Sequence, residues 1–494
     1  MKKLKKGVML LHRYLGFVLS LLFVCWFLSG FVMMYASYPT MKYHQRLQQL
    51  PAVRLGACRL TPQQAMVTAG ITDTVRSMRI GMLLDRPVYR MITQKNQHLT
   101  VFADSGTVLR EVDTALAAKV ATAFVNNSSR PQRIETLSQI DQWMAAHRSQ
   151  GYLPQVHRCE MDDAAGTYVY VSVYTGEAVQ KLNGRQRFWA WLGPVPHWIY
   201  PTVLIRNRQV WSQVVIWVSL IGCVMCLSGI IMGIIRYKRK RGNGLDFSPY
   251  KKRWFRYHHY TGFVFGLFVF TWVLSGLFSM GPLAIGPDSA RQLAERNVLS
   301  GAWVDVAGYQ LSPAQAMERL GKTVTVKELQ MISILGRPYY LAYEDGMHTC
   351  LLAADETDTQ PFRYYPVAPL LAAVKGFQQN YSVRSAEVLE RYDDYYYARA
   401  FDKRLPVLRV SFDNPEKTSY YIDLATGQLA LKHEKGSRVE RWLYHGLHSF
   451  DFSFLVYKRP LWDIVVLVLL TGGTLVSITG LVLTWKWCRR KVNS

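Results

Sequence analysis

The sequence predicts an α-helical membrane protein, in which four transmembrane helices form a tandem-duplicated bundle and carry two outward-facing α+β domains. Three observations predict this fold class: four long apolar segments, a repeat that relates the two halves of the chain, and basic residues at one end of every apolar segment. The mean hydropathy of the 494 residues is zero, so the apolar segments are averaged with sizeable soluble parts.

The first apolar segment, residues 11–35, returns at 257–280 without a gap, so that His12 aligns with His258. The triplet Leu-Ser-Gly ends both copies, at 28–30 and 274–276. Two further apolar segments, 211–235 and 464–485, are also related by the repeat. Each of the four is long enough to cross a hydrocarbon core of about 30 Å as a helix.

Basic residues precede the first and third apolar segments and follow the second and fourth, with Asp246 as the only acid among them. By the positive-inside rule, both termini and the short middle loop are cytoplasmic and the two long loops face outward. The same residues explain most of the net charge of +25. This charge therefore indicates membrane lipid as a partner and no nucleic acid.

These features predict alternating cytoplasmic, transmembrane and outward regions, with transmembrane helices 1 to 4 taken in chain order. The cytoplasmic parts are 1–10, 237–255 and 488–494; the helices are 11–35, 206–236, 256–281 and 458–487; the outward regions are 36–205 and 282–457.

The two outward regions repeat one order of elements. Each opens a helix with a hydroxyl N-cap followed by proline, at Thr61-Pro62 and Ser312-Pro313. Strand-like runs follow at 88–94 and 99–109 in the first region, and at 338–344 and 351–356 in the second. Late hairpins are predicted at 167–182 and 418–434, whereas 113–148 reads as helical.

Four histidines occupy equivalent positions of the two halves. His12 and His258 begin apolar spans, each with small residues one and two turns further along the same helix face. His197 and His448 precede the second and fourth spans, so they are expected at the opposite membrane face. The small residues alone are also typical of close helix packing, with the histidines then lying among lipid headgroups.

The repeat favours a cofactor site over this packing interpretation. Neutral imidazole binds iron well, and two histidines from facing helices can hold a b-type haem by its axial positions. No C-x-x-C-H motif occurs, so any haem is bound without covalent attachment. We expect two haems b, one between His12 and His258 and one between His197 and His448. His259 and His445 remain alternative ligands.

The HRYLGF and HHYTGF spans, their LSG endings, the LTPQQAM and LSPAQAM helix openings and the YTGEAV and ATGQLA turns resemble the PepSY-associated transmembrane helix family of bacterial iron-regulated membrane proteins. The resemblance covers nearly the whole chain. It implies a multi-pass protein of the bacterial inner membrane with PepSY-like outward domains, similar to ferrisiderophore reductases. It also implies that His12, His258, His197 and His448 are axial haem ligands.

The predicted function is electron transfer across the membrane to a ferric siderophore or another ferric chelate outside. No nucleotide-binding motif occurs, so the electron donor is expected to be a quinol or a separate cytoplasmic reductase. The alternative is a haem-free protein whose PepSY domains bind or regulate a peptidase or an envelope partner. A disulfide between Cys58 and Cys159 is left open.

Overall fold

The computed structural model describes residues 2–72, 74–145, 155–237, 248–281, 289–400 and 402–492. Most of the loop predicted over 237–255, and the end of the stretch 113–148, lie outside the described residues. The chain folds as two compact units. Residues 1–39, 185–286 and 438–494 form a helical unit, and residues 40–184 and 287–437 form a unit of sheets and short helices.

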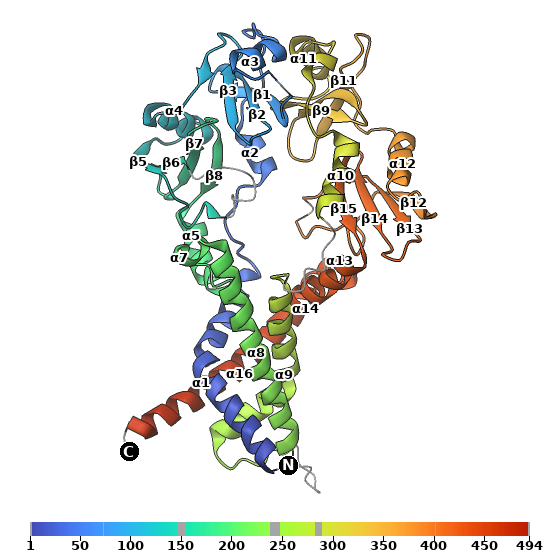
Figure 1. The fold of residues 1–494 in the computed structure, drawn as a ribbon. Helices are drawn as coiled ribbons and strands as arrows, with labels where there is room; N and C mark the ends of the chain where they lie inside the picture. Colours follow the sequence, from blue (N-terminus) through green and yellow to red (C-terminus); the bar gives the residue numbers. More distant parts are fainter. Residues whose placement is uncertain are drawn as a thin grey trace. The chain divides into compact units, whose positions relative to one another are not determined.

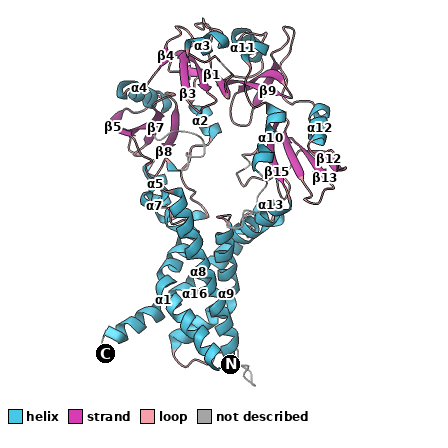
Figure 2. Cartoon of the chain, in the orientation of Figure 1, coloured by secondary structure: helices cyan, strands magenta, loops and turns pink. Residues whose placement is uncertain are grey.

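The predicted fold class is wrong. The protein is mixed α/β, with 46% helix and 19% strand, rather than an α-helical bundle protein. The strands form three antiparallel sheets (Figure 2). The four spans dominated the sequence pattern, whereas the strands are short and many of them are buried on both faces, so that they lack the alternation that marks a half-exposed sheet.

Four long helices build the helical unit: α1 (Lys2–Met33), α8 (Arg208–Arg236), α9 (Arg253–Phe278) and α16 (Leu461–Val492). Each contains a candidate membrane span, over Lys3–Met33, Arg208–Arg236, Arg253–Phe278 and Leu461–Val492. Short helices precede α8 and α16. They are α5 (Gly184–Leu192), α6 (Pro194–His197), α7 (Thr202–Ile205), α13 (Lys435–Glu440), a π-helical turn (Arg441–Gly446), α14 (Leu447–Ser449) and α15 (Ser453–Val456).

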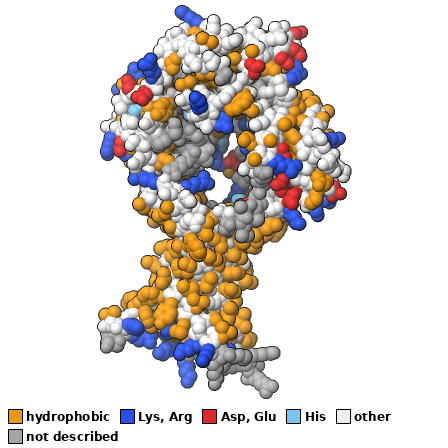
Figure 3. Space-filling model, in the orientation of Figure 1, with side chains coloured by type: hydrophobic (Ala, Val, Ile, Leu, Met, Phe, Trp, Pro, Cys, Tyr) orange, Lys and Arg blue, Asp and Glu red, His pale blue; other side chains and the backbone are white. Residues whose placement is uncertain are grey.

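The bundle places α1 and α9 each against both α8 and α16 (Figure 1). Small residues permit this packing, because a Cβ at Gly473 would lie 2.2 Å from the ring of Phe27, and one at Gly472 would lie 2.2 Å from the ring of Phe265. The outer surface of the bundle is apolar (Figure 3), with exposed side chains such as Val18 and Leu267. These features fit a lipid environment.

The second unit contains helices and strands from both halves of the chain. The first half supplies α2 (Tyr43–Gln49), α3 (Pro62–Thr68), β1 (Ser77–Leu83), β2 (Arg86–Ile92), β3 (His98–Phe102), β4 (Val108–Leu109), α4 (Thr114–Phe124), β5 (Pro131–Leu137), β6 (Val156–Met161), β7 (Tyr168–Ser172) and β8 (Ala178–Leu182). The second half supplies α10 (Ser289–Ser300), a 3-10 turn (Val306–Gly308), α11 (Pro313–Leu320), β9 (Glu328–Ile334), β10 (Arg337–Tyr343), β11 (Thr349–Ala353), α12 (Val367–Gly376), β12 (Val383–Leu389), β13 (Val407–Phe412), β14 (Ser419–Asp423) and β15 (Gln428–His433).

One seven-stranded sheet joins the two halves, in the order β11-β10-β9-β1-β2-β3-β4. Its central contact is the antiparallel pair β1–β9, in which Ile80 lies opposite Leu329. The remaining strands form one four-stranded sheet per half, β5-β6-β7-β8 and β12-β13-β14-β15. The two regions predicted to face outward are therefore not two separate α+β domains, because they share a sheet and a hydrophobic core that contains Met78 and Met331.

The predicted helix openings are confirmed. Thr61 and Ser312 cap α3 and α11, each in a capping box with the glutamine three residues later. The stretch 113–148 is only partly helical, because α4 ends at Phe124 and β5 follows. Cys58 and Cys159 are both free thiols and belong to different hydrophobic clusters, so the structure contains no disulfide between them.

Candidate functional site

The helical unit brings the four predicted histidines together as two pairs. The rings of His12 on α1 and His258 on α9 have centroids 6.2 Å apart, with an interplanar angle of 29°. The rings of His197 on α6 and His448 on α14 have centroids 5.9 Å apart, at 71°. Each pair joins equivalent residues of the two halves of the chain.

These separations suit two ligands of one metal ion. A histidine nitrogen binds a metal at about 2 Å, so two rings that share an ion end-on have centroids about 6 Å apart. A pair supplies only two ligands, and the other positions must come from elsewhere, as they do in a porphyrin with two axial histidines. No cluster of three or more His, Cys, Asp and Glu side chains that could hold an ion occurs among the residues that the structure describes.

The Nδ1 atoms of the first pair are held by the neighbouring helices α8 and α16. Nδ1 of His12 lies 3.0 Å from the carbonyl oxygen of Met225, and Nδ1 of His258 lies 3.0 Å from the hydroxyl of Thr479. That hydroxyl donates to carbonyl groups of its own helix, so it accepts from the imidazole. The proton therefore sits on Nδ1, and Nε2 is the basic nitrogen.

The second pair is held in the same manner by α1 and α9. Nδ1 of His197 lies 3.0 Å from the hydroxyl of Ser29 and 3.2 Å from the carbonyl oxygen of Trp26. Nδ1 of His448 makes the equivalent contacts with Ser275, at 3.0 Å, and with the carbonyl oxygen of Trp272, at 3.2 Å. Hydrogen bonds of this kind orient metal-binding histidines and raise the basicity of the ligand nitrogen.

These supporting residues are not among those predicted from the sequence. Ser29 and Ser275 are the serines of the repeated Leu-Ser-Gly triplets, so the signal was present as two matching polar residues inside apolar spans. Ser228 lies 3.4 Å from Nδ1 of His12 and is also matched in the other half, by Thr479. Such hydroxyls are common in membrane helices, and their pairing with the histidines appears only in three dimensions.

Room for a flat group exists next to the first pair. Gly16 and Gly262 lie one helical turn beyond His12 and His258, and a Cβ at either position would have no heavy atom within 4 Å.

Among the described residues, the hydroxyl of Ser20 and the indole N–H groups of Trp26 and Trp272 are buried without a hydrogen-bond partner. Burying an unpaired donor costs about 1–3 kcal/mol, so these groups mark places where a polar ligand atom would stabilise the bundle.

His259 and His445 are turned toward other partners. Nε2 of His259 lies 3.3 Å from the carbonyl oxygen of Gly233, and its ring stands against Tyr250. Nδ1 of His445 lies 4.0 Å from a carboxylate oxygen of Asp451, and its ring packs on Tyr444. The geometry thus favours His258 and His448 over these alternatives as the residues that face His12 and His197.

The fold and the site define a class: a mixed α/β membrane protein with four candidate spans and two half-buried histidine pairs related by an internal repeat. The sequence profile of the PepSY-associated TM region matches residues 9–486, and the chain belongs to this family. A search among curated proteins finds no match.

Proposed function

We propose that the protein is a transmembrane electron-transfer protein that holds two b-type haems and reduces ferric chelates outside the membrane. One observation carries the proposal: four histidines that are far apart in the sequence form two facing pairs, and all four Nδ1 atoms are engaged by carbonyl or hydroxyl oxygens. Family membership alone does not establish this activity.

His12 and His258 would hold the haem near the cytoplasmic face, and His197 and His448 would hold the haem near the outer face. Haem iron bound in this way exchanges single electrons. The chain itself fixes the tautomer of each imidazole, keeps the rings facing each other and excludes water from the bundle. These are the tasks that a protein performs for a redox cofactor.

The His197–His448 pair lies beside Trp26 of α1 and Trp272 of α9, within the length of these helices rather than beyond their ends. Along α1, the helical rise from His12 to Trp26 is about 21 Å. The two histidine levels are thus separated by less than the full length of a span. This arrangement supports electron transfer between two bound haems more than ligands at the extreme ends of the helices would.

The substrate of the proposed reaction is a ferric siderophore or another ferric chelate. One electron converts Fe(III) to Fe(II), which oxygen-rich chelators bind more weakly, so iron is released. The electron comes from a membrane quinol or from a separate cytoplasmic reductase. The inner membrane and an outward-facing sheet unit are part of this proposal, since they follow from the charge distribution in the sequence.

The test is the visible spectrum and haem content of the detergent-purified chain. We expect a low-spin b-type spectrum with about two haems per chain for the wild type, and about one haem each for His12→Ala and His448→Ala. His348→Ala is the matched control, because this exposed histidine belongs to the sheet unit, and its haem content should equal that of the wild type. A colourless wild-type protein from haem-replete cells would refute the proposal and favour a haem-free PepSY protein that binds an envelope partner.

A further inference from the structure

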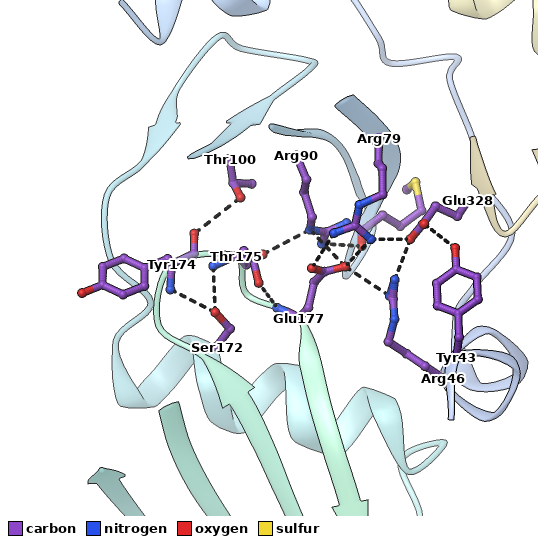
Figure 4. A network of polar contacts seen from close by, with 11 residues as sticks. Tyr43, Arg46, Arg79, Arg90, Thr100, Ser172, Tyr174, Thr175, Glu177 and Glu328 are labelled. Atoms are coloured by element: carbon purple, nitrogen blue, oxygen red, sulfur yellow. Dashed lines mark hydrogen bonds and ion pairs between the residues drawn. The ribbon is translucent and has the colours of Figure 1, made fainter. Parts of the chain in front are cut away.

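A buried ionic cluster lies inside the sheet unit, whereas the histidine pairs belong to the helical unit (Figure 4). It contains three arginines and two glutamates: Arg46 from α2, Arg79 from β1, Arg90 from β2, Glu177 from the turn before β8, and Glu328 from β9. The side chains of both glutamates are only 2% exposed. Charges buried to this extent are costly unless they are paired.

Two of the arginines satisfy both carboxylates. Arg46 approaches Glu177 at 3.1 Å and Glu328 at 2.6 Å, and Arg79 approaches them at 3.1 and 3.0 Å. Glu328 also accepts a hydrogen bond from the hydroxyl of Tyr43, at 2.6 Å. Arg46, Arg79 and Tyr43 therefore already contact the two glutamates without any contribution from the third arginine.

Arg90 is the excess cation of the cluster. Its Nε lies 3.7 Å from Glu177, and it donates hydrogen bonds to the carbonyl oxygens of Thr175 and Met82, each at 3.2 Å. Its side chain is only 7% exposed. With three guanidinium groups and two carboxylates, the cluster carries one more buried positive charge than its carboxylates balance, and Arg90 shares Glu177 with Arg46 and Arg79.

A cavity of about 840 Å³ lies next to the cluster, because Arg46, Arg90 and Glu177 are among the residues that line it. Its walls carry more cations than anions, because Arg46, Arg90, Lys119, Arg130 and Lys327 line it whereas its acidic residues are Asp85 and Glu177. Lys119 is exposed at the wall, and Lys327 donates to the carbonyl oxygen of Leu50. The volume is within the range of small-molecule sites, about 300–1,000 Å³.

We propose that this cavity binds a small organic anion that carries two or more carboxylate or phosphate groups. Guanidinium groups are suited to such oxygens because their N–H donors match both atoms of a planar carboxylate or two oxygens of a phosphate. Lys119 and Lys327 also line the cavity, and they supply positive charge for a second anionic group of the same ligand. For the proposed reductase this makes anionic ferric chelates the substrate class, and that step rests on the proposed function.

The binding test uses the full chain in detergent and isothermal titration calorimetry at low salt. The probes are tricarballylate, pyrophosphate and the redox-inert gallium(III) citrate complex. We expect saturable binding that weakens as salt is raised, because the attraction is between charges. A stronger response to tricarballylate than to pyrophosphate would assign carboxylates, and the reverse order would assign phosphates. Absence of saturable binding of all three probes at millimolar concentration would overturn the proposal.

Variants locate the binding in the cavity. Lys119→Glu should weaken binding about tenfold or more, whereas Lys375→Glu, at an exposed lysine of the same unit outside the cavity, should leave it unchanged. Equal effects of the two variants would overturn the site. Arg90→Gln should weaken binding further, with its melting temperature measured as a check on folding.

The His12→Ala variant separates this proposal from the haem proposal. Because His12 belongs to the other unit, its loss should remove about one of the two haems and leave the affinity for tricarballylate unchanged. Anion binding that disappears together with haem would contradict a site inside the sheet unit.

Discussion

At the scale of single residues, the histidine pairs depend on how closely backbone approaches the rings. Gly229 on α8 and Gly480 on α16 are equivalent in the repeat, and each faces one histidine of the first pair. A Cβ at Gly229 would lie 2.6 Å from Cε1 of His12, whereas a Cβ at Gly480 would lie 3.4 Å from Cε1 of His258. The first contact is impossible without movement, and the second is an ordinary van der Waals distance.

Gly229→Ala should therefore displace the ring of His12 and break its hydrogen bond to Met225. In the proposed haem protein, we expect this variant to lose at least half of the haem at the His12–His258 site. Gly480→Ala is the matched control and should retain nearly all of it. Haem content per chain and the melting temperature of both variants provide the measurement. Equal haem loss in the two variants would contradict the geometry of the first pair.

The buried glutamates allow a second prediction at the residue scale. Glu177→Gln removes one of the two carboxylates that face three guanidinium groups, and breaking a buried ion pair on one side costs about 3–5 kcal/mol. Glu356→Gln removes an ion pair with Arg337 in which the glutamate side chain is 63% exposed, and it should cost less than about 1 kcal/mol. Thermal unfolding followed by circular dichroism compares them. A similar melting temperature for the two variants would show that the cluster is not stabilising.

The same cluster predicts a dependence of stability on pH. Burial alone would raise the pKa of Glu177, but Arg79, Arg90 and Arg46 outweigh it and hold this pKa below the ordinary value of 4.5. A carboxylate whose pKa is lowered by folding stabilises the protein above its unfolded pKa, and this stabilisation is lost as pH falls. We expect the melting temperature of the wild type to decrease as the pH is lowered below about 4.5. The decline should be shallower in Glu177→Gln, and an identical decline would exclude Glu177 as its origin.

At the scale of elements, the contact between β1 and β9 decides whether the two outward regions fold together. Gln330 lies on β9 between β10 and β1, opposite Leu341 on one side and Arg79 on the other. Proline has no N–H and interrupts a central strand, at a cost of about 3 kcal/mol or more. Gln330→Pro should therefore destabilise the regions from both halves at once.

Limited proteolysis measures this effect. We expect new cleavage sites in both 40–184 and 287–437 for Gln330→Pro. Arg384→Pro is the control, because Arg384 occupies a bulge in the edge strand β12, where proline is tolerated. Cleavage confined to the second half in Gln330→Pro would indicate that the shared sheet does not couple the two regions.

The central sheet also explains what the sequence could and could not predict. The helix openings at Thr61 and Ser312 follow from local capping chemistry, and the structure confirms them. The strands β1 and β9 are buried along most of both faces, so they show no alternation of apolar and polar residues. The pairing of one half with the other depends on contacts that no local pattern encodes.

In the candidate site, too, some features could be predicted from the sequence and others depend on contacts between distant segments. The internal repeat indicated which histidines correspond, and a shared bundle then places His12 opposite His258. The buried role of Arg90 could not be predicted, because an arginine that contacts Glu177 and two carbonyl oxygens resembles a surface arginine when only its sequence neighbours are known. Partners contributed by separate segments become visible only after folding.

At the scale of the whole molecule, the distribution of charge predicts how the chain is oriented in the membrane. Basic residues gather at one end of each long helix, as Lys5 does in the first turns of α1 and Arg490 in the last turn of α16. The positive-inside rule therefore predicts that these ends lie in the cytoplasm and the sheet unit outside. Lys95 is an exposed residue of that unit, remote from the spans in sequence.

Labelling with a membrane-impermeant maleimide tests this orientation. In a Cys58→Ala background, Lys95→Cys should react in intact spheroplasts, whereas Lys5→Cys should react only after the membrane is permeabilised. The parent variant is the control for background, since Cys25 lies within the candidate span of α1 and Cys488 lies near the terminus that is predicted to be cytoplasmic. The remaining cysteines, Cys159, Cys223, Cys226 and Cys350, are buried. Reaction of Lys5→Cys in intact spheroplasts would show that the topology is the reverse of the predicted one. The His197–His448 pair would then face the cytoplasm, and the reduction of an external chelate could not occur at that end.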